Sequence, residues 1–143
     1  MAQVRVALAL LLGSLVAGCS PPHSPTSASL CNRLAATTDL HVTLMFGLTR
    51  PDGRPVTDAD WQDFLRTEIV PRFPDGLSVL PAQGFWRDRD TGRTDSEPSR
   101  LVWIVTPDRT DLAERIEAVR RAYRTRFRQQ SVGVSVEQGC SQF

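Results

Sequence analysis

The amino-acid sequence predicts an α+β fold in which two helices cover one face of an antiparallel sheet. Four segments show the apolar patterns of β-strands. Two longer segments repeat apolar residues at the three- and four-residue spacing of amphipathic helices. The order along the chain is strand, helix, strand, strand, helix, strand. This is the split βαβ, or ferredoxin-like, arrangement, in which the last strand lies antiparallel beside the first.

The first strand and the first helix follow directly from local patterns. In residues 39–48 apolar residues occupy every second position, which predicts a strand with one strongly apolar face. Residues 50–55 contain two prolines and a glycine and predict a turn. Thr57 is followed by acidic residues, which predicts the capped start of a helix that ends at Pro71.

The remaining elements are a hairpin, a helix and a last strand. Pro81 interrupts the second strand, which favours an edge position for it in the sheet. A turn at residues 90–92 leads to a strand over residues 100–106 that we expect to be buried on both faces or nearly so. A helix over residues 108–129 and an alternating strand over residues 131–137 follow. The helix carries one apolar stripe, formed by Leu112, Ile116, Val119, Tyr123 and Phe127.

The first 18 residues have the layout of a signal peptide, because Arg5 precedes an apolar run that ends in small residues. The run is shorter than the about 20 apolar residues that a membrane-spanning helix needs. Residues 16–19, Val-Ala-Gly-Cys, resemble the bacterial lipobox, in which the cysteine is lipidated and becomes the new N-terminus. We therefore expect residues 1–18 to be removed and Cys19 to hold the protein in a membrane. The alternatives are an ordinary signal peptide with an incidental cysteine, or a plain hydrophobic N-terminus.

Residues 19–29 are predicted to be a lipidated cysteine and a disordered tether. Residues 20–29 hold three prolines and no apolar periodicity, so we expect His23 to be solvated there. Residues 30–143 then suit a single domain with one core. We expect the protein in the bacterial cell envelope, and Ser20, in place of an aspartate after the cysteine, favours the outer membrane if the cell has one.

Charge and motifs argue against several classes of protein. The chain has 17 basic residues, all of them arginine, and 16 acidic residues. Removal of the signal peptide takes away Arg5 alone, so the mature chain is balanced and gives no support to nucleic-acid binding. The sequence contains no phosphate-binding glycine loop, dinucleotide fingerprint or metal-ligand cluster. We therefore expect no cofactor and no metal site.

The three cysteines divide into one lipid site and one pair. If Cys19 carries lipid, Cys31 and Cys140 remain as an even pair in an oxidising compartment. A bridge between them closes a very long loop and contributes about 4 kcal/mol. The predicted topology brings the start of the first strand near the end of the last strand, so fold and cysteine count support each other. The alternatives are two free thiols or a zinc site, and zinc would lack further ligands.

Three stretches of the chain resemble the bacterial family of domains of unknown function numbered 3574. They are TLMFGLTRPDGRPVTDADWQDFL, IVPRFPDGLSVLPAQGFWRD and IEAVRRAYRTRFRQQSVGVSVE, which together cover most of residues 43–137. The resemblance implies one intact domain in an exported protein or lipoprotein. It implies no mechanism, because members of the family have no assigned activity.

His41 and Glu137 are the weak candidates for acid–base chemistry. Strand alternation places His41 opposite the apolar face, and Glu137 has the corresponding position in the last strand. If these strands are neighbours, the carboxylate orients the imidazole and favours its charged form. The alternative is a solvent-exposed polar pair, which is the more common arrangement.

The second candidate site is the stretch GFWRDRDTGR, residues 84–93, which combines aromatic, basic and acidic residues. As a binding lip for an anion or a partner, it would use Trp86 for packing and Arg87 for bidentate contacts. The alternative is a hairpin whose charges pair with one another. Arg72 is a further candidate for holding an anion.

Arginines also gather toward the C-terminal end of the second helix. They either contact anionic lipid headgroups or complement the helix dipole, with Glu117 paired to Arg120 or Arg121. The group consists of Arg120, Arg121, Arg124, Arg126 and Arg128.

Two function classes remain. The first is a ligand- or protein-binding module of the cell envelope, displayed on a lipid tether. The second is a small-molecule enzyme on the open sheet face, with His41 as acid or base. Met45, Leu80 and one side of the strand over residues 101–105 leave that face partly apolar, so a homodimer formed over it suits either class. A deep enclosed pocket at His41 would favour the enzyme, whereas a flat, wet face would favour the binding module.

Overall fold

A computed structural model of the protein describes residues 26–143. The predicted signal peptide, Cys19 and His23 lie outside the described residues. Within residues 26–143, no helix is both long enough and apolar enough to cross a bilayer.

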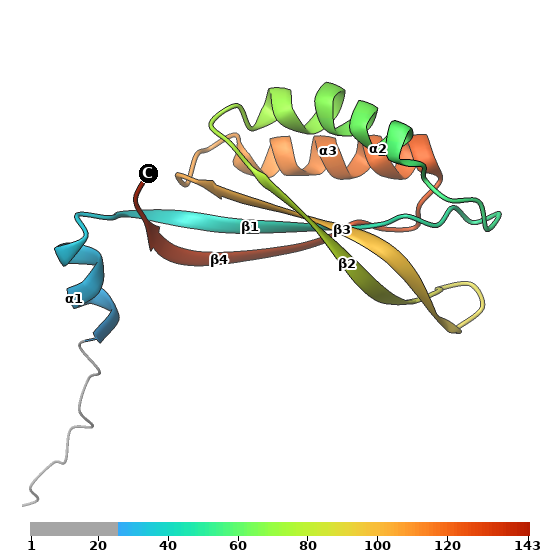
Figure 1. Ribbon diagram of the computed structural model, residues 1–143, viewed down its shortest axis with the longest axis horizontal. Helices are drawn as coiled ribbons and strands as arrows, with labels where there is room; N and C mark the ends of the chain where they lie inside the picture. The colour runs from blue at the N-terminus through green and yellow to red at the C-terminus, as the bar shows by residue number, and fades with distance from the viewer. Residues whose placement is uncertain (1–25) are drawn as a thin grey trace, which may run out of the picture.

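The elements occur in the predicted order, with one additional helix at the start. They are α1 (Thr26–Arg33), β1 (Thr37–Gly47), α2 (Asp58–Phe64), β2 (Ser78–Arg87), β3 (Thr94–Thr106), α3 (Leu112–Phe127) and β4 (Gly133–Ser141). The antiparallel sheet has the order β2-β3-β1-β4, and α2 and α3 lie side by side over one of its faces (Figure 1). The ferredoxin-like fold is therefore confirmed, and β2 is an edge strand as Pro81 predicted.

Helix α2 begins as predicted but ends differently. The hydroxyl of Thr57 accepts a hydrogen bond from the backbone N–H of Asp60, whose side chain accepts one from the N–H of Thr57, which completes a capping box. The α-helix stops at Phe64 and continues as a π-helical segment (Leu65–Ile69) and a 3-10 turn (Val70–Arg72). Pro71 therefore sits inside the final turn, where a 3-10 turn tolerates it better than an α-helix interior does.

Five aromatic residues form the centre of the core between the helices and the sheet. The rings of Phe46 and Tyr123 are 4.7 Å apart in an edge arrangement, the geometry that aromatic pairs prefer. All five side chains are buried: Phe46, Trp61, Phe64, Tyr123 and Phe127. The predicted apolar stripe of α3 is confirmed, because all five of its residues are buried.

The prediction that residues 100–106 are buried on both faces or nearly so is wrong. Val102 and Ile104 are fully buried beneath the helices, but Trp103 between them keeps 39% of its surface exposed. The reason is that both helices cover the same face of the sheet, so the opposite face remains open. Strand β3 is also longer than predicted, since pairing with β2 continues its hydrogen-bonded ladder back to Thr94.

Helix α1 begins at Thr26, inside the stretch that we predicted to be a tether without regular structure. Its last turn is tied to the sheet by the disulfide between Cys31 and Cys140, whose Cα atoms are 6.0 Å apart. The pairing of Thr38 with Cys140 shows why the bridge forms, because β1 and β4 are antiparallel neighbours at this end. The covalent link is a tertiary constraint that the composition of residues 20–29 does not reveal.

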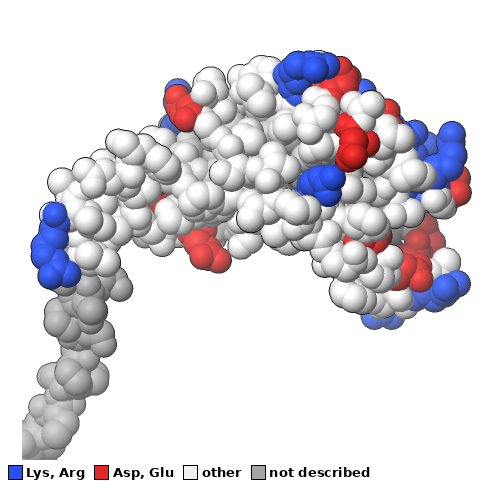
Figure 2. Space-filling model, viewed as in Figure 1, with Lys and Arg blue, Asp and Glu red and all other residues white. Residues whose placement is uncertain are grey.

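Charges on the surface are mixed. In the view of Figure 2, basic and acidic residues alternate over the helices and the hairpin end, and neither sign dominates that face. The ion pairs between described residues agree with this view, because several arginines lie within 4 Å of a carboxylate, such as Arg126 at 2.8 Å from Asp63.

Candidate functional site

His41 and Glu137 are opposite each other in the β1–β4 register, on the open face of the sheet. No hydrogen bond or ion pair between described residues joins their side chains. The imidazole instead packs edge-on against Trp103, with 5.8 Å between ring centroids. Its Nε2 is buried without a hydrogen-bond partner among the described residues. The two residues are neighbours as predicted, but His41 lines none of the three pockets described below.

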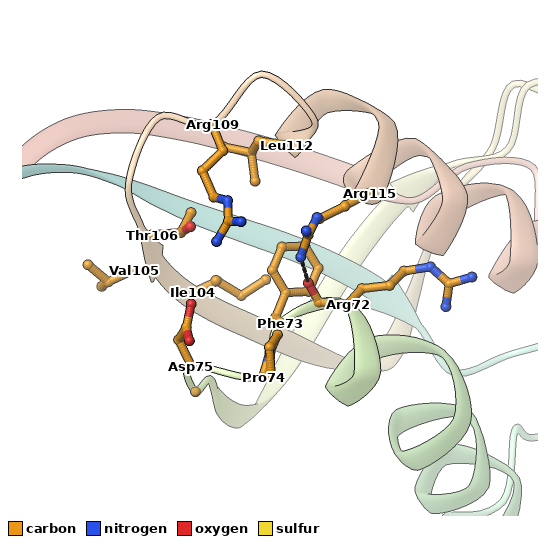
Figure 3. Close-up of a pocket in the computed structure, with 11 residues that line it drawn as sticks. Arg72, Phe73, Pro74, Asp75, Ile104, Val105, Thr106, Arg109, Leu112 and Arg115 are labelled. Atoms are coloured by element: carbon orange, nitrogen blue, oxygen red, sulfur yellow. Dashed lines mark hydrogen bonds between the residues drawn. The ribbon is translucent and has the colours of Figure 1, made fainter.

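Arg72 lies beside a small cavity between the 3-10 turn (Val70–Arg72) with the loop after it, strand β3 and the start of α3. The cavity measures about 10 Å³, which is space for about one water molecule. Figure 3 shows the guanidinium of Arg72 turned away from it, while Arg109 and Arg115 point toward it. Arg72 is bound to the side chain of Glu68 at 3.0 Å, and its carbonyl accepts a hydrogen bond from Arg115. This geometry leaves little room for an anion held by Arg72.

Two of the arginines at the end of α3 have partners within the domain. Arg120 pairs with Glu117, as predicted, and its Nε donates to the carbonyl of Val132. Arg126 pairs with Asp63 at the end of α2. These contacts support the interpretation that this part of α3 is a structural surface.

A larger pocket of about 370 Å³ lies at the end of the sheet where β1 finishes. Three connections surround it: the β1–α2 loop, the β2–β3 hairpin and the α3–β4 loop. Gln129 donates to the carbonyl of Thr49 at 2.7 Å, and Gln130 accepts from the N–H of Arg89 at 3.1 Å. These two glutamines therefore join the α3–β4 loop to both other walls. We call this the hairpin pocket; its lining includes Arg50, Trp86, Arg87, Glu97 and Gln129.

Glu97 is the half-buried acid of the hairpin pocket. Its Oε2 accepts a hydrogen bond from the backbone N–H of Thr49 at 2.9 Å. Burial raises the pKa of Glu97, and the hydrogen bond from Thr49 opposes that shift only in part. No arginine or histidine of the described residues forms an ion pair with it. Its negative charge is therefore uncompensated in a partly desolvated position.

Trp86 forms an aromatic wall of the same pocket. Its indole lies over Gly84, where a Cβ would come within 2.5 Å of the indole Nε1 and within 2.4 Å of Ser99 Oγ. The absence of a side chain at position 84 is what allows the ring to lie against the strand. The indole Nε1 is buried and has no hydrogen-bond partner among the described residues.

The two arginines of the pocket differ in their contacts. Arg50 is held by Asp60 at 2.8 Å and by the ring of Phe127, whose centroid is 5.3 Å from its Cζ. Arg87 donates from Nε to the carbonyl of Gly92 at 3.3 Å and forms no ion pair with a described residue. Among the residues that line the hairpin pocket, Arg87 is therefore a cation without an ion pair, and Glu97 and Asp88 are acids without one. Asp88 differs from Glu97 because hydrogen bonds from Thr91 and Gln130 already occupy its carboxylate.

Comparison with known proteins gives a family but no activity. The family described as "Protein of unknown function (DUF3574)" matches residues 41–143. The chain belongs to this family. No curated protein gives a significant match to the sequence.

Solved structures share the fold of this DUF3574 domain. A phage SAM lyase in complex with S-methyl-5'-thioadenosine is 18% identical, with a TM-score of 0.60 over 73% of this chain and 85% of the lyase. A phage SAM lyase in the apo state is 19% identical, with a TM-score of 0.55 over 73% of this chain and 86% of the lyase. CutA from Synechococcus elongatus is 15% identical, with a TM-score of 0.46 over 73% and 80%. At these identities the likeness to the two lyase structures shows the fold alone.

Sequence reasoning found two residues of the hairpin pocket in this DUF3574 domain and missed the others. Trp86 and Arg87 stood out because aromatic and basic residues are adjacent in the hairpin. Glu97 gave no comparable signal, since it lies in a polar stretch without periodicity. Its role depends on the pairing of β3 with β1, which brings it beside Gly47 and Thr49. No group of three or more His, Cys, Asp or Glu side chains among the described residues is arranged to hold a metal.

Proposed function

We propose that the protein is a lipid-anchored binding module of the cell envelope that takes up a small zwitterionic ligand in the hairpin pocket. The observation that carries this proposal is the pair of uncompensated, opposite charges on Arg87 and Glu97 in one pocket. At about 370 Å³ the pocket falls within the range of small-molecule sites. Its walls come from three hydrogen-bonded connections, so much of the site exists before a ligand binds.

Each charge has a distinct role in this proposal. The guanidinium of Arg87 receives the carboxylate of the ligand, for which its planar donor geometry is suited. The carboxylate of Glu97 receives the ammonium group, and this contact favours the ionised form of Glu97 against the effect of burial. Trp86 supplies a flat surface for the carbon skeleton between the two charges. A free amino acid or a short peptide has this combination of groups.

A titration with a dipeptide tests the site. We expect unlabelled Ala-Ala to shift the backbone amide signals of Thr49, Trp86 and Glu97 in an NMR spectrum of the purified full chain. N-acetyl-Ala-Ala lacks the ammonium group, and Ala-Ala amide lacks the carboxylate. Each should bind about tenfold more weakly, because a hydrogen bond to a charged group is lost.

Two variants test the contributions of Glu97 and Arg87 to binding separately. Glu97→Gln should remove the preference for Ala-Ala over the N-acetyl form, and Arg87→Gln should remove the preference over the amide. Arg89→Gln is the matched control, because Arg89 is in the same hairpin, is exposed, forms no ion pair with a described residue and does not line the pocket. Equal binding of the three dipeptides, or no shift at the pocket residues, would overturn the proposed ligand class.

The lipid anchor is tested separately. Cys19→Ala should abolish labelling by a fatty-acid probe and release the protein from the membrane fraction, since several acyl chains on one residue give stable anchoring. Cys31→Ser is the matched control, because Cys31 is in the disulfide with Cys140 and is not expected to be lipidated, so the fatty-acid label should remain. Membrane retention of the Cys19→Ala variant with undiminished lipid label would contradict the anchor.

A further inference from the structure

A second hollow lies at the opposite end of the sheet, where β1 begins and β3 ends. It measures about 600 Å³ and is open to solvent. β1 separates it from the hairpin pocket, since Thr37 lines the hollow and Gly47 lines the pocket. Eleven residues of extended chain place the two sites about 30 Å apart. We call this second site the Trp103 hollow.

The wall of the Trp103 hollow is largely apolar. Trp103 and Val105 come from the open face of β3, and Leu77 and Pro107 come from the segments on either side. Trp103 keeps 39% of its surface exposed although it is the largest side chain on that part of the strand. A large aromatic surface left open in a concave site is typical of small-molecule binding.

The charged side chains that line the Trp103 hollow are both acidic. Asp39 is only 8% exposed, and it accepts hydrogen bonds from the hydroxyls of Ser141 and Thr37. These hydroxyls, Ser141 first, lower the pKa of Asp39, so the buried carboxylate is ionised at neutral pH. Asp75 adds a second, exposed carboxylate. Neither acid forms an ion pair with a described residue, and no arginine lines the hollow.

We propose that the Trp103 hollow binds a small organic ammonium ion with an apolar body. The cationic group would lie at the Asp39 and Asp75 carboxylates, neither of which forms an ion pair with a described residue. The apolar body would cover Trp103 and Val105, and an ammonium group near the indole face gains further attraction from the ring. This site is separate from the hairpin pocket, which offers charges of both signs, and the proposal stands without the zwitterion site.

Three compounds of similar shape test the charge requirement. The probe is 2-phenylethylamine, which is a cation at neutral pH; 2-phenylethanol is its neutral analogue, and 3-phenylpropionate is its anionic analogue. We expect the amine to shift the indole N–H signal of Trp103 and the amide signals of Val105 and Asp39 in the full chain. The alcohol should bind about tenfold more weakly and the acid more weakly still, because the ion pair is lost.

Two variants locate the charge. Asp75→Asn should weaken binding of the amine by about tenfold, and it is exposed, so it is expected to fold. Asp39→Asn should weaken binding as much or more. Glu114→Gln, on the outer surface of α3, is the control and should change nothing. If Asp39→Asn fails to fold, Asp75→Asn and the comparison of the three compounds still decide the matter.

Three results would overturn the proposal. The first is equal binding of the amine, the alcohol and the acid. The second is an amine that shifts the hairpin-pocket signals and leaves those of Trp103 and Val105 unchanged. The third is a doubling of the mass in solution that removes Trp103 from solvent, since a second copy of the chain would then be the occupant of the open face.

Discussion

The carboxylate of Glu97 lies directly over Gly47, so close that a Cβ at position 47 would be 2.3 Å from Glu97 Oε1. The same carboxylate accepts the N–H of Thr49 at 2.9 Å. From the helix layer, the hydroxyl of Tyr123 donates to the carbonyl of Gly47 at 2.7 Å. Gly47 is therefore the point where the end of β1 is joined both to the hairpin pocket and to the aromatic core.

Gly47→Ala should displace the Glu97 side chain, because a flexible carboxylate moves more easily than the two strands do. The backbone N–H of Thr49 then loses its acceptor, which we expect to lower the free energy of unfolding by about 1–3 kcal/mol. The Thr49 amide signal should shift strongly in an NMR spectrum, and urea unfolding gives the change in stability. An unchanged Thr49 signal would show that Glu97 does not occupy this position.

The titration of Glu97 predicts that the free energy of unfolding of the wild type, relative to that of Glu97→Gln, depends on pH. Burial raises the pKa of Glu97 above its ordinary value of 4.5, so the folded chain holds this proton more tightly than the unfolded chain does. The resulting stabilisation is fully present below pH about 4.5 and is lost as the pH rises through the higher folded pKa.

The free energy of unfolding of the wild type should therefore fall, relative to that of Glu97→Gln, as the pH rises through this window. Other carboxylates titrate nearby, but their contributions cancel in the comparison. Urea unfolding at a series of pH values gives the difference. A difference that is constant between about pH 4 and pH 7 would contradict the raised pKa.

Tyr123→Phe should destabilise the domain without changing its shape. The variant keeps the buried ring but leaves the carbonyl of Gly47 without the hydroxyl donor. We expect a loss of about 1–2 kcal/mol in the free energy of unfolding. The unfolding midpoint in urea measures it, and a loss below a few tenths of a kcal/mol would show that the buried hydrogen bond is not formed.

The same tyrosine should resist ionisation. Burial raises the pKa of Tyr123 above its ordinary value of 10.0, and the chain contains no other tyrosine. The ultraviolet absorbance of tyrosinate should therefore remain low above pH 10.0 and appear together with unfolding. A tyrosinate signal that rises near pH 10.0 while the circular dichroism remains native would be the contrary result.

The disulfide between Cys31 and Cys140 spans 109 residues of sequence. Reduction, or the double variant Cys31→Ser and Cys140→Ser, should lower the free energy of unfolding by about 4 kcal/mol, because the unfolded chain gains the freedom of a long loop. Intact mass before and after reduction and alkylation establishes the bridge, and thermal unfolding gives its contribution. Alkylation of both cysteines in the unreduced, native protein would disprove the pairing.

Local patterns in the sequence determined most of the fold. The period of apolar residues distinguished strands from helices, and their order predicted the ferredoxin-like topology, the edge position of β2 and the neighbourhood of β1 and β4. The buried stripe of α3 was correct residue by residue, because a helix facing a sheet repeats its contacts every three or four positions. The pairing of Cys31 with Cys140 followed from that topology.

The candidate sites were decided by tertiary structure. Trp86 and Arg87 were visible in the hairpin, but Glu97 enters the pocket only through the register of β3 against β1. The strand over residues 100–106 was expected to be buried on both faces or nearly so, but Trp103 on its open face is partly exposed. Asp39, Asp75 and Trp103 come from separate segments that meet only after the sheet forms. Periodicity is a property of neighbouring residues, whereas a pocket depends on the distances between segments that only packing brings together.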